Sequence, residues 1–299
     1  MKAKSLIKAR ENKYFYLFIS PWIIGFLLFT GGPILMSIFY SFTQYNIADP
    51  PVFVGAKNYS QLFNDPLFWK SAKVTLYYTL LAVPLGLVLS LLTAMLVNVE
   101  IPGQRFFRTI IYLPSIISGV ALSLLWLWML NPQLGVLNFL IYKLTGQQGP
   151  QWLLSEEWVI PSLVMMSLWG IGPNMVIYLA GLKGVPSSLY EAADIDGASK
   201  FSKFIHITVP MVSPATLFLL ITGIIGTFQV FVQAQIMTQG GPNYASFFFV
   251  YFLYQQAFGS FNMGYASAMA WILFVVVLLL TWLMMSLSKR WVHYEGGNQ

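Results

Sequence analysis

Side chains that could carry out catalysis are few in this sequence and are spread along the chain. There is no cysteine, which excludes disulfides, thiolate metal sites and cysteine nucleophiles, and the histidines His206 and His293 are too far apart to suggest a metal cluster. No phosphate-binding G-x-x-x-x-G-K-[ST] loop is present. Outside segment 183–210, the carboxylates that could act at a membrane face form no recognisable catalytic pair: Asp49, Asp65, Glu100, Glu156 and Glu157. We therefore expect no enzyme activity and no metal site in this chain.

The composition indicates that the solvent around most of the chain is lipid. Hydrophobic residues make up 57% of the 299 residues and charged residues only 9%, against roughly 25% charged residues in an ordinary soluble domain. Such a chain cannot cover itself with a charged surface, so we expect an all-α membrane protein. Its 24 Phe, 16 Tyr and 10 Trp suit lipid contacts and interfacial belts.

Long stretches without Lys, Arg, Asp or Glu mark the expected transmembrane helices. A helix needs about 20 apolar residues to cross the hydrocarbon core, and the stretch between Lys203 and Lys289 holds two crossings, divided by the polar turn 238–243. The first stretch is too long for a signal peptide, so we interpret it as a retained helix. One transmembrane domain, 1–299, therefore has about six spans: about 15–41, 73–97, 109–130, 158–181, 211–236 and 264–287.

The basic residues predict the orientation. With the N-terminus inside, the inner segments carry 12 Lys and Arg, and the outer segments carry four, Lys57, Lys70, Lys73 and Lys143. Segment 1–14, segment 183–210 and the tail 288–299 are then cytoplasmic. The formal charge of +6 reflects this topology, and we expect no nucleic-acid partner.

The interior of the spans offers neutral polar groups beside aromatic rings. No ionisable side chain falls inside the expected cores, whereas proton relays and ion-coupled carriers generally place such groups there. A neutral polar solute such as a sugar suits this lining, although each residue taken alone is more often a helix–helix contact. The breakers Pro33, Pro84, Pro114 and 170–173 are either ordinary kinks or points of unwinding near a solute path.

Segment 183–210 is polar and charged, yet it lies between two long apolar segments. Ser188-x-x-Glu191 fits a capping box, and Gly197 is well placed to end the helix that follows. A second short helix with an apolar stripe runs on to Pro210. We expect a helix–turn–helix on the cytoplasmic face, in which Glu191 either caps its own helix or meets a partner.

The same segment resembles a known family. Glu191-Ala192-Ala193, then Gly197, then Ile207-x-Val209-Pro210 resembles the EAA signature of permease subunits in bacterial binding-protein-dependent ABC importers, with Val209 where leucine is usual. The segments 53–55, 57–59, 62–63, 65–69, 238–242 and 264–268 resemble landmarks of carbohydrate-uptake permeases, the branch of the maltose and glycerol-phosphate systems.

The resemblance implies a type I importer permease in the bacterial inner membrane, with both termini cytoplasmic, and a coupling loop at 183–210. It implies three partners: an ABC ATPase dimer that binds ATP and Mg, a second homologous permease, and an extracytoplasmic solute-binding protein. This chain itself would bind no cofactor. The residues implied in ATPase coupling are Glu191, Ala192, Ala193, Asp196, Gly197, Phe201, Phe204, Ile207 and Pro210.

The family places solute contacts on the helices before and after the motif. The positions implied here are Ser115, Trp169, Gly170, Thr227, Gln229 and Phe231. The expected function is ATP-driven import of a sugar or oligosaccharide by alternating access. Glycerol phosphate is an alternative solute, although it favours a cation that the spans lack; an ion-driven carrier and a membrane enzyme are less well supported alternatives.

Overall fold

The computed structural model describes residues 2–99 and 102–293, with side chains from residue 14 onward. Residues 294–299 of the expected tail, and Glu100, lie outside the described residues. The chain divides into two compact units, Met1–Asn64 with Tyr254–Ile272 and Asp65–Leu253 with Leu273–Gln299. The single domain expected for 1–299 stays a prediction.

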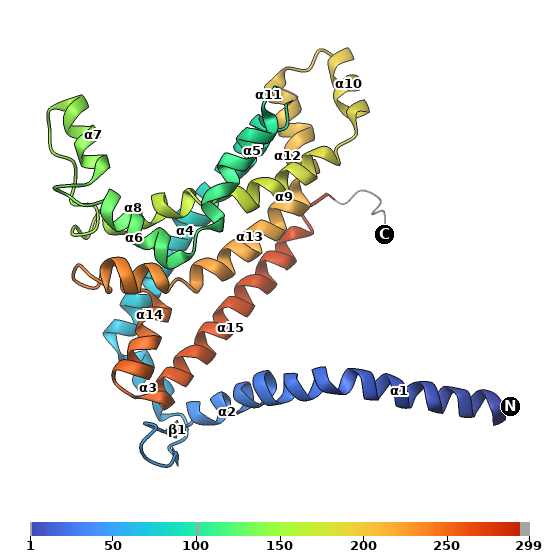
Figure 1. Ribbon diagram of the computed structural model, residues 1–299, viewed down its shortest axis with the longest axis vertical. Coiled ribbons are helices and arrows are strands. Elements are labelled where there is room, and N and C mark those ends of the chain that lie inside the picture. The colour runs from blue at the N-terminus through green and yellow to red at the C-terminus, as the bar shows by residue number, and fades with distance from the viewer. Residues whose placement is uncertain (1, 100–101, 294–299) are drawn as a thin grey trace. The chain divides into compact units, whose positions relative to one another are not determined.

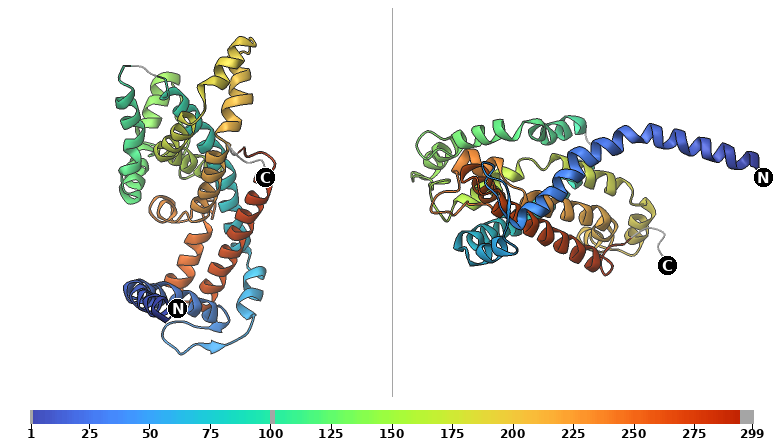
Figure 2. Two further views of the ribbon diagram at one scale, coloured as in Figure 1. Left: turned by 90° about the vertical axis from the view of Figure 1, so that its right-hand side faces the viewer. Right: turned by 90° about the horizontal axis from the view of Figure 1, so that it is seen from below.

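The first unit begins with a long, almost uninterrupted helical run, seen as one ribbon in the right-hand view (Figure 2). Its elements are α1 (Lys2–Phe26), π-helix η1 (Leu27–Gly31), α2 (Gly32–Ser41), β1 (Thr43–Gln44), β2 (Val52–Phe53), α3 (Lys57–Asn64), π-helix η5 (Gln255–Gly259) and the start of α15 (Met263–Ser288). The π-turn lies just before Pro33, and the Gly32 N–H bonds to the Leu27 carbonyl. This wider turn accommodates a proline that cannot donate within an α-helix.

A small antiparallel hairpin organises the other end of this unit. Thr43 pairs with Phe53 and Gln44 with Val52. The buried Asn58 amide donates to the carbonyls of Ser41 (2.9 Å) and Thr43 (2.8 Å). Gly264 N–H donates to Tyr45 O at 3.2 Å, and a Cβ at Gly264 would collide with the Thr43 carbonyl. The landmarks at 57–59 and 264–268 therefore tie the start of α15 to the hairpin.

The second unit is a bundle of helices (Figure 1). Its elements are α4 (Pro66–Leu96), α5 (Gln104–Tyr112), 3₁₀ helix η2 (Leu113–Ile116), α6 (Gly119–Met129), α7 (Val136–Thr145), α8 (Val159–Leu168), α9 (Gly172–Lys183), α10 (Ser187–Ile195), α11 (Lys200–Lys203), π-helix η3 (Phe204–Thr208), α12 (Val209–Met211), α13 (Ser213–Phe228), π-helix η4 (Ala234–Thr238), α14 (Phe249–Tyr254) and the end of α15. Asp65 caps α4 by accepting from Leu67 N–H at 2.8 Å.

Among the described residues, three helical stretches are long and apolar enough to cross a membrane, Tyr14–Ser41, Pro66–Leu96 and Met263–Ser288. Six result if each bent pair counts as one crossing: Gln104–Ile116 with Gly119–Met129, Val159–Leu168 with Gly172–Lys183, and Lys200–Met211 with Ser213–Phe228. The all-α membrane fold expected from the sequence is confirmed.

Three of the expected spans are not single helices. The chain bends by 99° within 109–130, by 51° within 158–181 and by 64° at the start of 211–236. Each bend falls at a breaker: Pro114 lies in η2, Pro173 opens α9, and Pro214 opens α13. The helix expected over 211–236 also ends early. α13 stops at Phe228, where the Gln229 N–H bonds to Gly226 O at 3.2 Å.

One hydrophobic core joins α4, α9 and α13. It is built by residues that are at most 8% exposed: Ala94, Val97, Met175, Tyr178, Leu179, Leu182, Val212 and Leu219. Because lipid tails are as apolar as these side chains, close van der Waals packing and not removal from water holds this core together. Leu182 precedes segment 183–210 and Val212 follows it, so both ends of that segment are fixed in the same core.

Candidate functional site

The expected helix–turn–helix is formed by α10 and by the helical run from α11 to α12. Its first helix begins earlier than the capping box requires. Pro186 (φ −61°, ψ 130°) is the N-cap and makes no side-chain hydrogen bond, so Ser187 and Ser188 are already helical. The capping box with Ser188 at the N-cap is therefore wrong, because the fixed φ of proline sets the helix start two residues earlier.

The turn after α10 is made by Gly197, as expected. Its φ is +73°, a left-handed conformation that favours glycine. Ala198 N–H donates to Ala193 O at 2.9 Å, and Gly197 N–H donates to Asp194 O at 3.1 Å. These two bonds are the Schellman arrangement, which satisfies the last carbonyls of the helix. Ser199 then caps the next helix by accepting from Ser202 N–H at 3.2 Å.

Two side-chain pairs hold the helices of the loop against each other. The Tyr190 hydroxyl and the buried Thr208 hydroxyl are 2.9 Å apart. Lys203 Nζ lies 2.6 Å from Asp194 Oδ1, with side-chain exposures of 18% and 64%. Neither pair was predicted from the sequence, because partners 18 and nine residues apart follow no helical period.

Pro210 follows a π-turn. The Val209 N–H bonds to the carbonyl of Phe204, five residues earlier, across η3. The same arrangement precedes Pro33, and in both places the wide turn relieves the carbonyl clash that proline would cause in an α-helix. The motif segment from Ile207 to Pro210 thus sets the geometry in which the loop enters α13, with the 64° bend at Val212.

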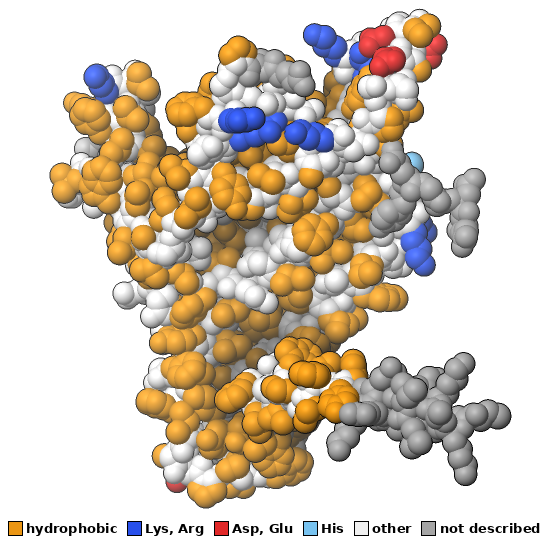
Figure 3. Space-filling view, turned by 45° about the vertical axis from the view of Figure 1, so that its right-hand side comes forward, with side chains coloured by type: hydrophobic (Ala, Val, Ile, Leu, Met, Phe, Trp, Pro, Cys, Tyr) orange, Lys and Arg blue, Asp and Glu red, His pale blue; other side chains and the backbone are white. Residues whose placement is uncertain are grey.

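The outer surface of the loop presents apolar and acidic side chains to solvent. Ile195 is 89% exposed and Phe201 is 74% exposed. Glu191, Ala192 and Asp196 are exposed as well. Within the part of the chain that the structure describes, Glu191 makes no hydrogen bond or ion pair, so it does not cap its own helix. Figure 3 shows acidic and basic side chains together at this end of a surface that is otherwise largely hydrophobic.

Two of the six expected solute contacts line one small cavity of about 140 Å³. Gly170 and Thr227 meet there, in a lining completed by Tyr78, Ala82, Val83, Gly86, Leu87, Ser167, Leu168, Ile171, Asn174, Leu219 and Gly223. Thr79 Oγ1 donates to Thr227 Oγ1 at 3.0 Å and links α4 to α13. The break between α8 and α9 places Gly170 at this cavity. Tyr78 and Ser167 were missed because hydroxyls inside apolar helices give no spacing signal.

The other four expected contacts do not line this cavity. The Ser115 hydroxyl donates to Tyr112 O at 2.6 Å within its own turn. Trp169 packs edge-on against Trp126, with ring centroids 5.6 Å apart. Gln229 ends α13 as an exposed C-cap. Phe231 lies 6.4 Å from the ring of Tyr251. The expected set is therefore divided between one cavity and four separate environments.

Comparison with known proteins agrees with this architecture. Residues 72–293 match the family "Binding-protein-dependent transport system inner membrane component". The chain is 40% identical to the probable ABC transporter permease protein YesP of Bacillus subtilis over 302 residues, covering 100% of this chain and 97% of that protein. It is 32% identical to the arabinooligosaccharides transport system permease protein AraP of the same organism, covering 91% and 88%.

Further similar proteins are named for other solutes. The chain is 31% identical to the sn-glycerol-3-phosphate transport system permease protein UgpA of Agrobacterium fabrum, covering 93% and 96%. The crystal structure of a bacterial ABC transporter that imports the acidic polysaccharide alginate shares the fold, with a TM-score of 0.82 at 24% identity, covering 96% of this chain and 99% of that one. This chain belongs to the inner-membrane component family of binding-protein-dependent transport systems, the permease subunits of ABC transporters.

Proposed function

We propose that this chain is the membrane subunit of an ATP-driven importer that moves a neutral sugar or oligosaccharide into the cytoplasm. ATP and Mg bind to a separate ATPase dimer that docks on the coupling loop 183–210. A second, homologous permease completes the path, and an extracytoplasmic binding protein delivers the solute. The coupling loop and both termini face the cytoplasm, in accord with the distribution of basic residues.

The observation that carries this proposal is the construction of the coupling loop. It presents Glu191, Ile195 and Phe201 outward, without partners for the two apolar side chains in the described structure. Exposed apolar groups beside charged ones favour a protein partner. At the other side, Leu182 and Val212 fix the loop in the core of α4, α9 and α13.

This construction supports alternating access as the transport mechanism that we propose. Closure of the ATPase dimer displaces the loop, and the core transmits the displacement to α9 and α13. At the cavity, α13 carries Thr227, and Gly170 lies in the break just before α9. Because the turn and the two side-chain pairs make the loop stiff, the motion reaches the helices as a rigid-body tilt. Hydrolysis then restores the inward-facing state.

The uncharged cavity lining supports a neutral solute. Tyr78, Asn174 and Thr227 offer hydroxyl and amide groups, which suit sugar hydroxyls. Glycerol phosphate is the alternative, supported by the glycerol-phosphate relative. A phosphate monoester favours a cation in its site, and none of the residues that line this cavity is charged.

Reconstituted uptake distinguishes these solutes. The chain is purified with its ATPase, second permease and binding protein, and the complex is inserted into proteoliposomes. We expect uptake of a neutral saccharide that requires internal ATP and persists without an ion gradient. Uptake of glycerol 3-phosphate alone would reject the neutral solute, and uptake that follows an ion gradient without ATP would reject the importer.

A conservative variant tests the role of Glu191. Glu191→Gln keeps the shape and removes the charge, and a charge-assisted hydrogen bond is worth about 1.5–3 kcal/mol. We therefore expect the affinity for the ATPase subunit to fall about tenfold or more. Ser188→Ala on the same exposed helix is the control. Equal ATPase affinity in both variants would exclude Glu191 from the contact.

A further inference from the structure

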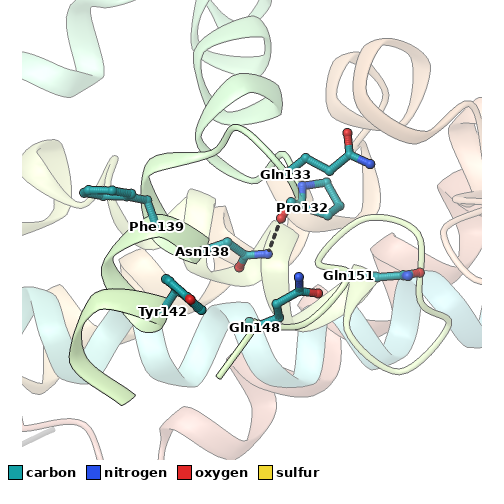
Figure 4. A pocket seen from close by; sticks show the side chains of 8 residues that line it. Pro132, Gln133, Asn138, Phe139, Tyr142, Gln148 and Gln151 are labelled. Carbon is teal, nitrogen blue, oxygen red and sulfur yellow. Dashed lines mark hydrogen bonds between the residues drawn. The ribbon is translucent and has the colours of Figure 1, made fainter. Parts of the chain in front are cut away.

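A second cavity, of about 490 Å³, lies beside α7 and the loops on either side of it (Figure 4). All eight residues that line it are uncharged: Pro132, Gln133, Asn138, Phe139, Tyr142, Gln148, Gly149 and Gln151. Its volume falls in the range of small-molecule sites, about 300–1,000 Å³. It shares no lining residue with the 140 Å³ cavity of the proposed path.

The frame of this cavity is held by one buried amide. The Asn138 Nδ2 donates to the carbonyls of Pro132 (2.9 Å) and Pro150 (3.3 Å), so a single side chain joins both flanking loops. Its Oδ1 accepts from Trp152 Nε1 at 2.7 Å. A Cβ at Gly149 would collide with the Asn138 side chain, which shows how closely the second loop passes over the helix. The cavity is thus preformed.

The other polar side chains that line the cavity, in contrast, do not help to hold its frame together. The side-chain amides of Gln133, Gln148 and Gln151 make no hydrogen bond to another residue that the structure describes, and all three are exposed. The rings of Phe139 and Tyr142 are 63% and 59% exposed. Figure 4 shows the rings of Phe139 and Tyr142 on one side of Asn138 and the amides of Gln133 and Gln151 on the other.

We propose that this cavity binds one sugar unit of a neutral oligosaccharide on the outer face of the membrane, an inference that rests on the proposed function and its orientation. Each glutamine amide supplies both a donor and an acceptor, which matches adjacent hydroxyls. The aromatic faces match the apolar C–H faces of a sugar ring. An anionic ligand would meet no cation among the lining residues.

The position of the cavity in the chain supports an outer site. It follows the bent pair α5–α6, which leads away from the predicted inner residues Arg105 and Arg108. A sugar held there is outside the small cavity at Gly170 and Thr227. The site would hold one sugar unit of an oligosaccharide before the chain enters the path.

Direct binding to the permease complex tests this site. The complex is placed in nanodiscs without its binding protein, and maltotriose and arabinotriose are titrated by saturation-transfer NMR. Loss of two hydrogen bonds of about 1 kcal/mol each corresponds to roughly thirtyfold in affinity. We expect Gln148→Ala/Gln151→Ala to weaken trisaccharide binding by about tenfold or more. Gln147→Ala, exposed next to the cavity but outside its lining, is the matched control and leaves the affinity unchanged.

Each contrary result overturns the inference. It fails if neither trisaccharide binds the unmodified complex, or if the double variant binds as tightly as the control. It also fails if the double variant instead raises the concentration of binding protein that is needed to stimulate ATP hydrolysis. That result would mean that these glutamines bind the binding protein and not the sugar. ATP-driven uptake is measured with the same purified complex in proteoliposomes supplied with its binding protein. Uptake of a neutral saccharide without an effect of the double variant rejects only this site, whereas no such uptake contradicts the proposed function itself.

Discussion

The turn at Gly197 allows the coupling role to be tested through backbone conformation alone. Gly197 has φ +73°, and a Cβ built there meets no atom within 4 Å. A substitution therefore adds strain without a collision. A residue with a Cβ pays about 1–2 kcal/mol in this conformation, asparagine tolerates it best, and a β-branched residue tolerates it least. We expect the defects to rise in the order Gly197→Asn, Gly197→Ala, Gly197→Val.

The magnitude follows from the same figures. Strain of about 1–2 kcal/mol lowers the population of the native turn, relative to alternatives, by roughly five- to thirtyfold. Solute transported per ATP hydrolysed is the quantity to measure in proteoliposomes, together with the affinity of the permease for the ATPase. Gly226→Ala is the control, since its Cβ also meets nothing but its backbone is helical.

Equal defects in the asparagine, alanine and valine variants would refute this reasoning. So would a ranking by side-chain size alone. Either result would mean that the space next to Gly197 is filled by a partner, so that contact and not backbone conformation limits the coupling.

Three further predictions concern a hydrogen bond within the loop, a close helix contact and the small cavity. Tyr190→Phe and Thr208→Val each remove one member of a 2.9 Å hydrogen bond, so a double-mutant cycle in thermal unfolding should give a coupling energy of about 0.5–1.5 kcal/mol. Gly172→Ala places a Cβ 2.6 Å from Tyr112 Cα, and we expect a loss of stability of about 1–3 kcal/mol in the same measurement. Thr227→Trp fills the 140 Å³ cavity, and uptake should fall below a tenth of normal while the ATPase still binds.

Matched variants control the last two experiments. Gly226→Ala in a helix with free space around its Cβ should be neutral or stabilising by up to about 1 kcal/mol. Thr222→Trp adds the same ring to an exposed position of α13 and should leave uptake intact. A double-mutant cycle that gives no coupling energy between Tyr190 and Thr208 would contradict the stabilising role of their hydrogen bond. Normal uptake with Thr227→Trp would contradict a solute path through the small cavity.

Features with a local physical cause could be predicted from the sequence. Gly197 ends α10 because few other residues adopt its backbone conformation, and the charge-free stretches mark the apolar helices because lipid excludes charge. The bends of 99° and 51° fall at breakers named from the sequence, Pro114 and 170–173, whereas the 64° bend before Pro214 was not expected and Pro84 lies inside the unbroken helix α4. The angles could not be predicted, because they depend on how neighbouring helices pack. The start of α10 was mistaken because Ser188 fits a cap equally well by sequence, whereas Pro186 sets the boundary.

Long-range side-chain contacts could not be predicted in the same way. Tyr190 meets Thr208 only because the turn at Gly197 folds the two helices together. The Ser115 and Thr227 hydroxyls both bond to carbonyls of their own helical turns, yet Thr227 lies at the small cavity and Ser115 does not. The uncharged cavity at Asn138 arises from two loops that converge on one amide, a geometry without a sequence period.

The most direct test of the account uses the absence of cysteine from this chain. Phe201→Cys and, in the loop predicted to lie outside, Gln147→Cys are prepared as single-cysteine variants, and a membrane-impermeant maleimide is applied to each side of proteoliposomes. We expect Phe201→Cys to react only from the cytoplasmic side and at least tenfold more slowly once the ATPase is bound, whereas the rate for Gln147→Cys, which reacts from outside, is unchanged. Reaction of Phe201→Cys from outside, or at the same rate with and without the ATPase, would contradict the coupling loop as the docking site.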